Sequence, residues 1–247
     1  MSEATIRRDT VWQQEDVARS YFSSRRGIPL ADVQLDVMRR LIEEHKVTVR
    51  NLLDFGAGDG AAAAVHSWQP VDRMVLVDLS HPMLDEARLR FAGVSAEIDY
   101  IEGDLLGSEW LPNIVARGPY DLVVSRYAIH HLPHDRKKSL YHDILGLLEP
   151  GGLFINIEHV KSASPVYQKA FDHLLIEGIN ATGDDAESIQ ATTEAYYSRQ
   201  DKDTNILASV EDQCEWLREI GFVDVDCAFK IFELAVFVGK KPVDSAQ

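Results

Sequence analysis

The chain has 247 residues, of which 45% are hydrophobic and 26% are charged, and this balance is typical of a globular protein with a substantial core. That length suits one ordinary α/β domain with room for a small cap. Acidic residues outnumber basic ones by 40 to 25, which gives a net charge of −15. Direct binding to nucleic acid is therefore disfavoured, because proteins that hold phosphates need clustered Lys and Arg.

The compact basic groups, at residues 25–26, 136–138 and 240–241, are interpreted as solvated faces or helix ends. No stretch approaches the roughly 20 apolar residues of a membrane helix, and the polar first residues lack the apolar segment of a secretory signal. Cys214 and Cys227 are too few for a disulfide framework or a cysteine zinc site. We expect a cytoplasmic protein with no membrane segment, in which both cysteines are buried as small apolar residues.

The expected elements alternate between helix and strand. Residues 1–46 are interpreted as an N-terminal lid of two helices, and an apolar strand at 47–55 then leads into a Gly-Ala-Gly-Asp-Gly turn and an alanine-rich helix. The alternation continues with strands at 73–78, 98–101, 120–125 and 153–157 and helices at 82–92 and 140–148. This pattern predicts a parallel sheet with helices on both faces, inside a domain that covers residues 47–247.

The end of the chain departs from this alternation. After a helix at 210–220, strands at 223–229 and 232–239 have almost nothing between them, so they must form an antiparallel hairpin. A dinucleotide-dependent dehydrogenase would instead repeat a second βαβαβ half. The reversed last strand therefore argues against an NAD-dependent oxidoreductase, which remains a minor alternative.

Three carboxylates lie at or just after the C-terminal ends of the first three predicted strands, at Asp54, Asp78 and Asp104. Asp78 can accept hydrogen bonds from both hydroxyls of a ribose, and Asp104 can accept the amino hydrogens of an adenine. Asp54 would repel a pyrophosphate but could pair with the ammonium of a methionine. Each acid alone could be a cap or turn residue. Three of them at the ends of successive parallel strands indicate that they contact a single bound ligand.

The glycine turn at 56–60 lets the backbone come close to a ligand, and the helix start after it offers free N–H groups to an anion. This anion could be a pyrophosphate or the carboxylate of a methionine, and Asp54 favours the carboxylate. Met83, in the segment after Asp78, can pack on an adenine face, although a core position is the alternative.

The segments at 56–60, 78–84, 103–104, 129–132 and 148–152 resemble the successive motifs of class I S-adenosylmethionine-dependent methyltransferases. The resemblance spans residues 45–240 and implies a Rossmann-like three-layer sandwich. Its mostly parallel seven-stranded sheet has the order 3-2-1-4-5-7-6, with the last strand antiparallel. The implied cofactor is S-adenosylmethionine, and the product is S-adenosylhomocysteine. The expected cofactor contacts are Asp54, Gly56, Ala57, Gly58, Asp78, Leu79, Met83, Asp104, Leu105 and Ser125.

Residues 26–29 and 209–217 are also similar to the carboxy-S-adenosylmethionine synthase branch, which transfers a carboxyl unit to the donor. That branch has an aromatic residue where this chain has Ala31, and its glycine turn is less glycine-rich. It holds the extra carboxylate with an arginine, and Arg199 lies in the comparable stretch. Methyl transfer to a small molecule at O, N or C is therefore the main interpretation. A donor-modifying enzyme is the alternative, and a regulatory donor-binding protein is a third possibility.

The candidate catalytic residues are His131, Glu158 and His159, which follow the fourth and fifth strands. The donor's methyl group is already electrophilic, so positioning supplies most of the catalysis, and a base is needed only if the acceptor arrives protonated. Histidine titrates near neutrality and suits that role, although one histidine of the pair at 130–131 could simply pack the loop. No metal is expected, because the spacing of His130, His131 and His134 fits no common zinc motif.

The acceptor is expected to contact the N-terminal lid and a helical insertion at about residues 161–207. Aromatic residues in this insertion could equally form the core of the cap. The sequence does not identify the acceptor, and a homodimer is left open. The candidate acceptor-binding residues are Tyr21, Arg26, His130, Tyr197 and Arg199.

Overall fold

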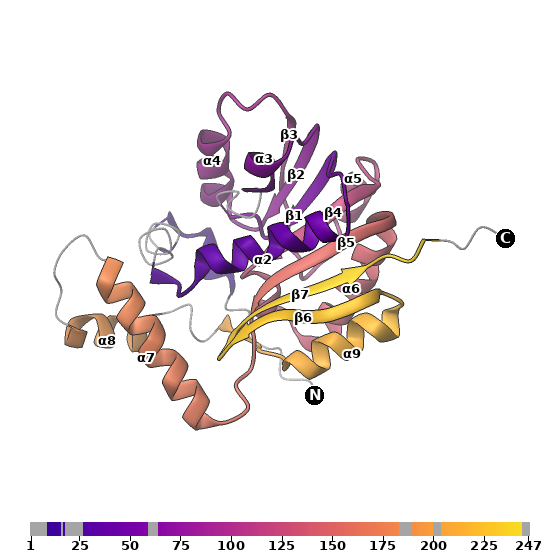
Figure 1. Cartoon of the computed structure of the whole chain (residues 1–247). Coiled ribbons are helices and arrows are strands. Elements are labelled where there is room, and N and C mark those ends of the chain that lie inside the picture. Colours follow the sequence, from indigo (N-terminus) through magenta and orange to yellow (C-terminus); the bar gives the residue numbers. More distant parts are fainter. Residues whose placement is uncertain are drawn as a thin grey trace, which may run out of the picture.

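The central sheet of the protein has the predicted strand order. The computed structural model describes residues 9–15, 17, 27–58, 64–182, 189–199 and 204–243. Its seven strands lie in the order β3-β2-β1-β4-β5-β7-β6, and only β7 runs antiparallel to its neighbours (Figure 1). The strands are β1 (Asn51–Phe55), β2 (Arg73–Asp78), β3 (Glu97–Glu102), β4 (Tyr120–Arg126), β5 (Leu148–His159), β6 (Val223–Ile231) and β7 (Leu234–Lys240).

Helices cover both faces of this sheet and complete a three-layer sandwich. One face packs against α5 (Leu111–Val115), α6 (His134–Leu147) and α9 (Val210–Ile220). The other packs against α2 (Ala31–Glu44), α3 (Val65–Trp68) and α4 (His81–Arg90). Helix α2 buries Gln34, Met38 and Ile42, which recur every four residues and so lie on one side of the helix. The prediction of helices on both sides of the sheet is confirmed.

The register of the parallel strands places their carboxyl ends at one edge of the sheet. Phe55 of β1 pairs with Val77 of β2 on one side and with Ser125 of β4 on the other. The segments that follow β1, β2 and β4 therefore meet at this edge. They contain the glycine turn, Asp78 and the histidine pair.

Two elements extend beyond the predicted ranges. Helix α6 begins at His134, whereas the predicted helix began at residue 140. The prediction started late because the first turns of the helix are charged and carry few of the apolar residues that reveal helical periodicity. Strand β5 begins at Leu148, although the Pro-Gly-Gly segment at 150–152 predicted a break before the strand. That segment is accommodated by a register shift between Tyr120 and Leu122 of the partner strand.

The insertion between β5 and α9 contributes α7 (Pro165–Thr182) and α8 (Ile189–Ser198), which stand away from the sheet (Figure 1). Phe171, Ile176 and Tyr196 pack together with Leu234 of β7 at its base. At the neck, the Lys161 N–H donates to the Ala208 carbonyl at 2.9 Å, so the outgoing and returning chains are joined.

The remaining described segments are the short 3-10 helices η1 (Asp9–Gln13) and η4 (Ile129–His131). No helix among the described residues is long and apolar enough to cross a membrane. Cys214 is buried and Cys227 is partly buried, and both are free thiols.

The N-terminal chain crosses α7 at a pair of glycines. A Cβ atom on Gly178 would lie 2.3 Å from the Gly27 carbonyl oxygen, and one on Gly27 would lie 2.4 Å from the Cα of Ile179. The two backbones can approach this closely only because neither residue has a side chain.

We predict that Gly178→Ala lowers the free energy of unfolding of the protein, because the new methyl group meets backbone that cannot move aside. Gly146→Ala is the matched control, since Gly146 is exposed on α6 and a Cβ there meets nothing within 4 Å. The control should gain about 0.5–1 kcal/mol from helix propensity. Urea unfolding of the two variants measures this difference, and an equal gain in both would contradict the predicted crossing.

Candidate active site

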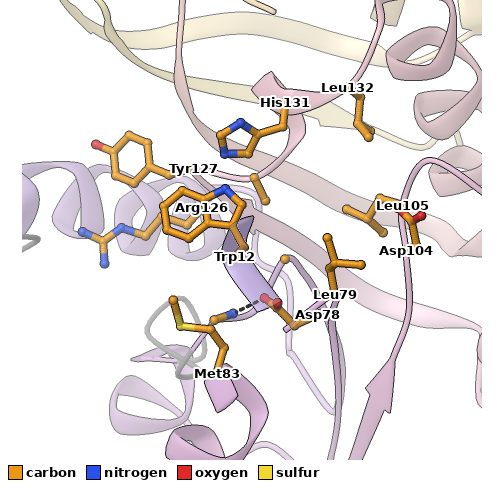
Figure 2. Close-up of a pocket in the computed structure, with 13 residues that line it drawn as sticks. Trp12, Asp78, Leu79, Met83, Asp104, Leu105, Arg126, Tyr127, His131 and Leu132 are labelled. Atoms are coloured by element: carbon orange, nitrogen blue, oxygen red, sulfur yellow. Dashed lines mark hydrogen bonds between the residues drawn. The ribbon is translucent and has the colours of Figure 1, made fainter. Parts of the chain in front are cut away.

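A pocket opens at the carboxyl edge of the sheet, between the ends of β1, β2 and β4 (Figure 2). One wall contains seven of the expected cofactor contacts. Trp12 of η1 and the residues after β4 close it on the other side. The lining residues are Trp12, Gly56, Gly58, Asp78, Leu79, Met83, Asp104, Leu105, Arg126, Tyr127, Ala128, His131 and Leu132.

The Asp78 carboxylate is held at the floor of this pocket by backbone amides. Its Oδ2 accepts the N–H of Gly58 and its Oδ1 accepts the N–H of Ser80, both at 2.7 Å. Burial raises the pKa of Asp78 to about 6, although these amides oppose the shift by favouring the charged form. A backbone hydrogen bond from Leu79 adds to these two and also favours the charged form.

The glycine turn needs its glycines for two different reasons. Gly56 has a φ of 63°, and a Cβ there would lie 2.1 Å from the Cβ of Ala128, so this residue lets the ends of β1 and β4 meet. Gly58 has a φ of 54° and would meet nothing within 4 Å, so it leaves open space in the pocket. The Ala57 N–H donates to the Val77 carbonyl at 3.0 Å and fixes the turn from below.

Asp104 and Leu105 form the far end of the pocket wall. The Asp104 Oδ1 accepts the Leu106 N–H at 2.9 Å, and the Trp110 indole N–H donates to the Asp104 carbonyl at 2.9 Å. The Arg136 Nε donates to the Leu105 carbonyl at 2.6 Å. These bonds hold the loop in one conformation.

Three expected contacts lie outside the pocket lining, namely Ala57, whose backbone bond is described above, Asp54 and Ser125. Asp54 is fully buried in β1, and Ser125 is buried in β4, where its hydroxyl donates to the Phe55 carbonyl at 2.8 Å. Both belong to strand ends that support the glycine turn.

Of the three candidate bases, His131 alone lines the pocket described here. Its Nδ1 lies 2.9 Å from the hydroxyl and 3.4 Å from the carbonyl oxygen of Thr204. Its ring centroid lies 5.7 Å from that of Trp12, so the two rings lie next to each other on the same side of the pocket (Figure 2).

Glu158 and His159 lie in a row behind His131. The fully buried Glu158 has its Oε1 2.7 Å from the Nδ1 of His130. The His159 Nε2 lies 2.6 Å from the Glu233 carboxylate. Burial raises the pKa of Glu158 and lowers the pKa of His130, because each charged form loses its hydration. A neutral His130 that donates to the Glu158 carboxylate satisfies both groups.

Residues 136–138 lie at the start of α6, as the helix-end interpretation expected, but Lys137 is fully buried, so the interpretation as a solvated face is wrong at this position. Its ammonium group donates to the carbonyls of His130, Leu132 and Ile206. Burial lowers the pKa of Lys137 to about 8. This one side chain ties the histidine turn to the chain that returns from the insertion.

The expected acceptor contacts of the insertion lie outside the pocket lining. The Tyr197 hydroxyl donates to Asp172 at 3.2 Å, and the Tyr196 hydroxyl donates to the same carboxylate at 2.6 Å. The Arg199 guanidinium carbon lies 4.3 Å from the Tyr196 ring centroid. Tyr21 and Arg26 lie outside the described residues.

The sequence did not single out Trp12, Arg126 or Tyr127. The last two follow a predicted strand directly, and their position at the carboxyl end of a parallel strand was the signal that could have identified them. Trp12 belongs to a polar segment with no pattern that connects it to the pocket.

Comparison with known proteins gives one family match. Residues 52–152 match the family model described as a methyltransferase domain. The carboxy-S-adenosyl-L-methionine synthase of Helicobacter hepaticus is 24% identical over 211 residues, which cover 84% of this chain and 82% of that protein. The ubiquinone/menaquinone biosynthesis C-methyltransferase UbiE of Pseudomonas putida is 27% identical over 161 residues, or 62% of this chain and 60% of that protein.

Solved structures share the fold at low sequence identity. An S-adenosylmethionine-dependent methyltransferase from Clostridium acetobutylicum superposes with a TM-score of 0.62 at 15% identity, over 92% of this chain and 98% of that one. An O-methyltransferase family protein from Burkholderia thailandensis gives a TM-score of 0.61 at 16% identity, over 97% of this chain. This chain spans 64% of that longer protein, which is less than two thirds.

The pKa of Asp78 predicts how ligand binding depends on pH. Only the ionised carboxylate can accept two hydroxyl hydrogens, so binding of S-adenosylhomocysteine should be strongest well above pH 6, where the group is fully ionised, and should weaken as the pH falls through 6. With about a tenth of the group ionised at pH 5, the Kd should rise about tenfold between pH 8 and pH 5. Calorimetry at both pH values measures this change. Asp78→Asn should bind weakly at both, and an unchanged wild-type Kd would contradict the prediction.

Proposed function

We propose that this chain is an S-adenosylmethionine-dependent methyltransferase that transfers the donor's methyl group to a small-molecule acceptor at an O, N or C atom, and the match of residues 52–152 to a methyltransferase domain supports this. One observation carries the proposal: a fixed carboxylate, an open glycine turn and the Asp104 loop share one pocket wall at the carboxyl ends of parallel strands.

The residues present fit the donor in one orientation. Asp78 presents a fixed carboxylate to which ribose hydroxyls can donate, and Gly58 leaves space where any side chain would intrude. The adenine would lie toward Asp104 and Leu105, with Leu79 and Met83 as apolar contacts. The methionine part would then lie along the glycine turn, above Asp54 and Ser125.

The donor supplies a methyl group on a positively charged sulfur, so the protein's task is to align an acceptor with that bond and exclude water. Trp12, Tyr127 and Leu132 offer apolar surface for this purpose. We propose His131 as the base for an acceptor that arrives protonated. With its Nδ1–H directed to the Thr204 carbonyl, the Nε2 presents a lone pair to accept the proton. Glu158 and His130 then act as positioning residues behind it, and His159 stays bonded to Glu233.

Ligand-dependent stabilisation tests this proposal. S-adenosylhomocysteine at about a hundred times its Kd should add about 2.7 kcal/mol to the free energy of unfolding, whereas NADH should add nothing. Asp78→Ala should lose most of this effect. Asp72→Ala, at the exposed opposite end of the same strand, should keep it. Absence of stabilisation by S-adenosylhomocysteine in the wild-type protein would sink the proposal.

A second candidate is a carboxy-S-adenosylmethionine synthase-like enzyme that modifies the donor. Relatives of that name at 24–27% identity over 68–84% of this chain support it, as does an arginine in the insertion. Ala31, in place of that branch's aromatic residue, argues against it. Mass spectrometry of ligand released from the purified protein separates the two functions. A carboxylated donor would favour the second candidate, and S-adenosylmethionine or S-adenosylhomocysteine alone would favour methyl transfer.

We further propose a cytoplasmic setting and no direct nucleic-acid partner, and we leave a homodimer open. The net charge of −15 supports the absence of a direct nucleic-acid partner. Size-exclusion chromatography with light scattering measures the oligomeric state.

A further inference from the structure

Arg126, the last residue of β4, is a pocket-lining cation that no described carboxylate neutralises. Its Nε is buried and has no hydrogen-bond partner within the described part of the chain. A buried donor without a partner is costly, because it has lost its bonds to water and gained none in return. A ligand that supplied the missing acceptor would remove this cost.

The guanidinium of Arg126 rests on a fixed aromatic platform. Its central carbon lies 5.6 Å from the ring centroid of Tyr127. Tyr127 has a φ of 53°, which is uncommon for a residue other than glycine and frequent at functional sites. Its N–H donates to the Ile157 carbonyl at 2.8 Å, and its hydroxyl donates to the fully buried Gln34 at 2.6 Å. The platform is therefore held by both β5 and α2.

The two arginines nearest the ends of the pocket are used differently. Arg136, beside the Asp104 loop, donates to the carbonyls of Leu105 and Gly107 and pairs with Asp143. Its donors are thus engaged in holding the loop. Arg126 lies on the opposite side of the pocket from Asp104 and Leu105, and its buried Nε has no hydrogen-bond partner among the described residues (Figure 2).

We infer that Arg126 binds a carboxylate at the end of the pocket opposite the Asp104 loop. A guanidinium is planar and offers parallel donors, so a carboxylate matches its geometry better than any neutral group does. This inference rests on the proposed function, which places the adenine at the Asp104 end and directs the rest of the ligand toward Arg126. The carboxylate belongs either to the methionine part of the donor or to the acceptor.

Calorimetry with Arg126→Gln tests the donor as the source. S-adenosylhomocysteine carries the carboxylate, and 5′-methylthioadenosine lacks the whole amino-acid part. If the donor supplies the group, the variant should bind S-adenosylhomocysteine about tenfold or more weakly and 5′-methylthioadenosine as well as the wild type does. Arg40→Gln is the matched control, because Arg40 is 67% exposed on α2 and should change neither affinity.

A second titration tests the acceptor as the source. Protein saturated with S-adenosylhomocysteine is titrated with benzoate and with benzamide, which differ in charge and little in shape. If the acceptor supplies the group, the wild type should prefer benzoate, and Arg126→Gln should lose this preference while it keeps its affinity for S-adenosylhomocysteine. Arg126→Lys keeps the charge without the planar fork, so it should retain part of the effect and provides a folded variant if the glutamine disrupts the pocket.

The inference is overturned if wild-type protein binds S-adenosylhomocysteine while Arg126→Gln and Arg126→Lys leave both comparisons unchanged. Wild-type protein that binds no S-adenosylhomocysteine would instead overturn the proposed function, and this inference with it. The two failures are therefore distinguishable.

Discussion

The alignment of parallel strand ends is the constraint on which the rest of the structure depends. Pairing of Phe55 with both Val77 and Ser125 brings three chain segments, far apart in sequence, to one edge of the sheet. Strands buried on both faces cannot slip in register without exposing apolar side chains, so the edge is fixed by the core. The glycine turn, the amide-held carboxylate and the histidine turn acquire their relative positions from it.

The two neighbouring histidines of the turn after β4, His130 and His131, lie in different environments. His131 faces the pocket, whereas His130 is buried against Glu158. Burial lowers the pKa of His130 and raises the pKa of Glu158, so the two side chains are held together by a hydrogen bond with a neutral imidazole beneath the pocket. Lys137 holds the turn from the other side through three carbonyls. Buried polar groups that are satisfied in this way restrict the turn to one conformation.

The strands and the pocket wall with Asp78 and Asp104 could be predicted, because apolar runs, turn residues and motif spacing are local signals. The strand order followed from the resemblance to class I S-adenosylmethionine-dependent methyltransferases. The separation of His131 from Glu158 could not, since it depends on which side chain each strand end turns toward the pocket. Lys137 resembled a solvated residue because its three partners are backbone carbonyls. Every residue has such a carbonyl, so the sequence does not indicate which of them lie near the lysine. Trp12 lines the pocket because the N-terminal segment packs against the sheet. No motif or residue spacing in the sequence predicts this position.

The hydrogen bond between the Lys161 N–H and the Ala208 carbonyl closes the neck of the insertion. Because the chain leaves and re-enters the sheet at the same point, the segment between behaves as a module on a fixed stem. Its length and sequence can change over evolutionary time while the strands below keep their places.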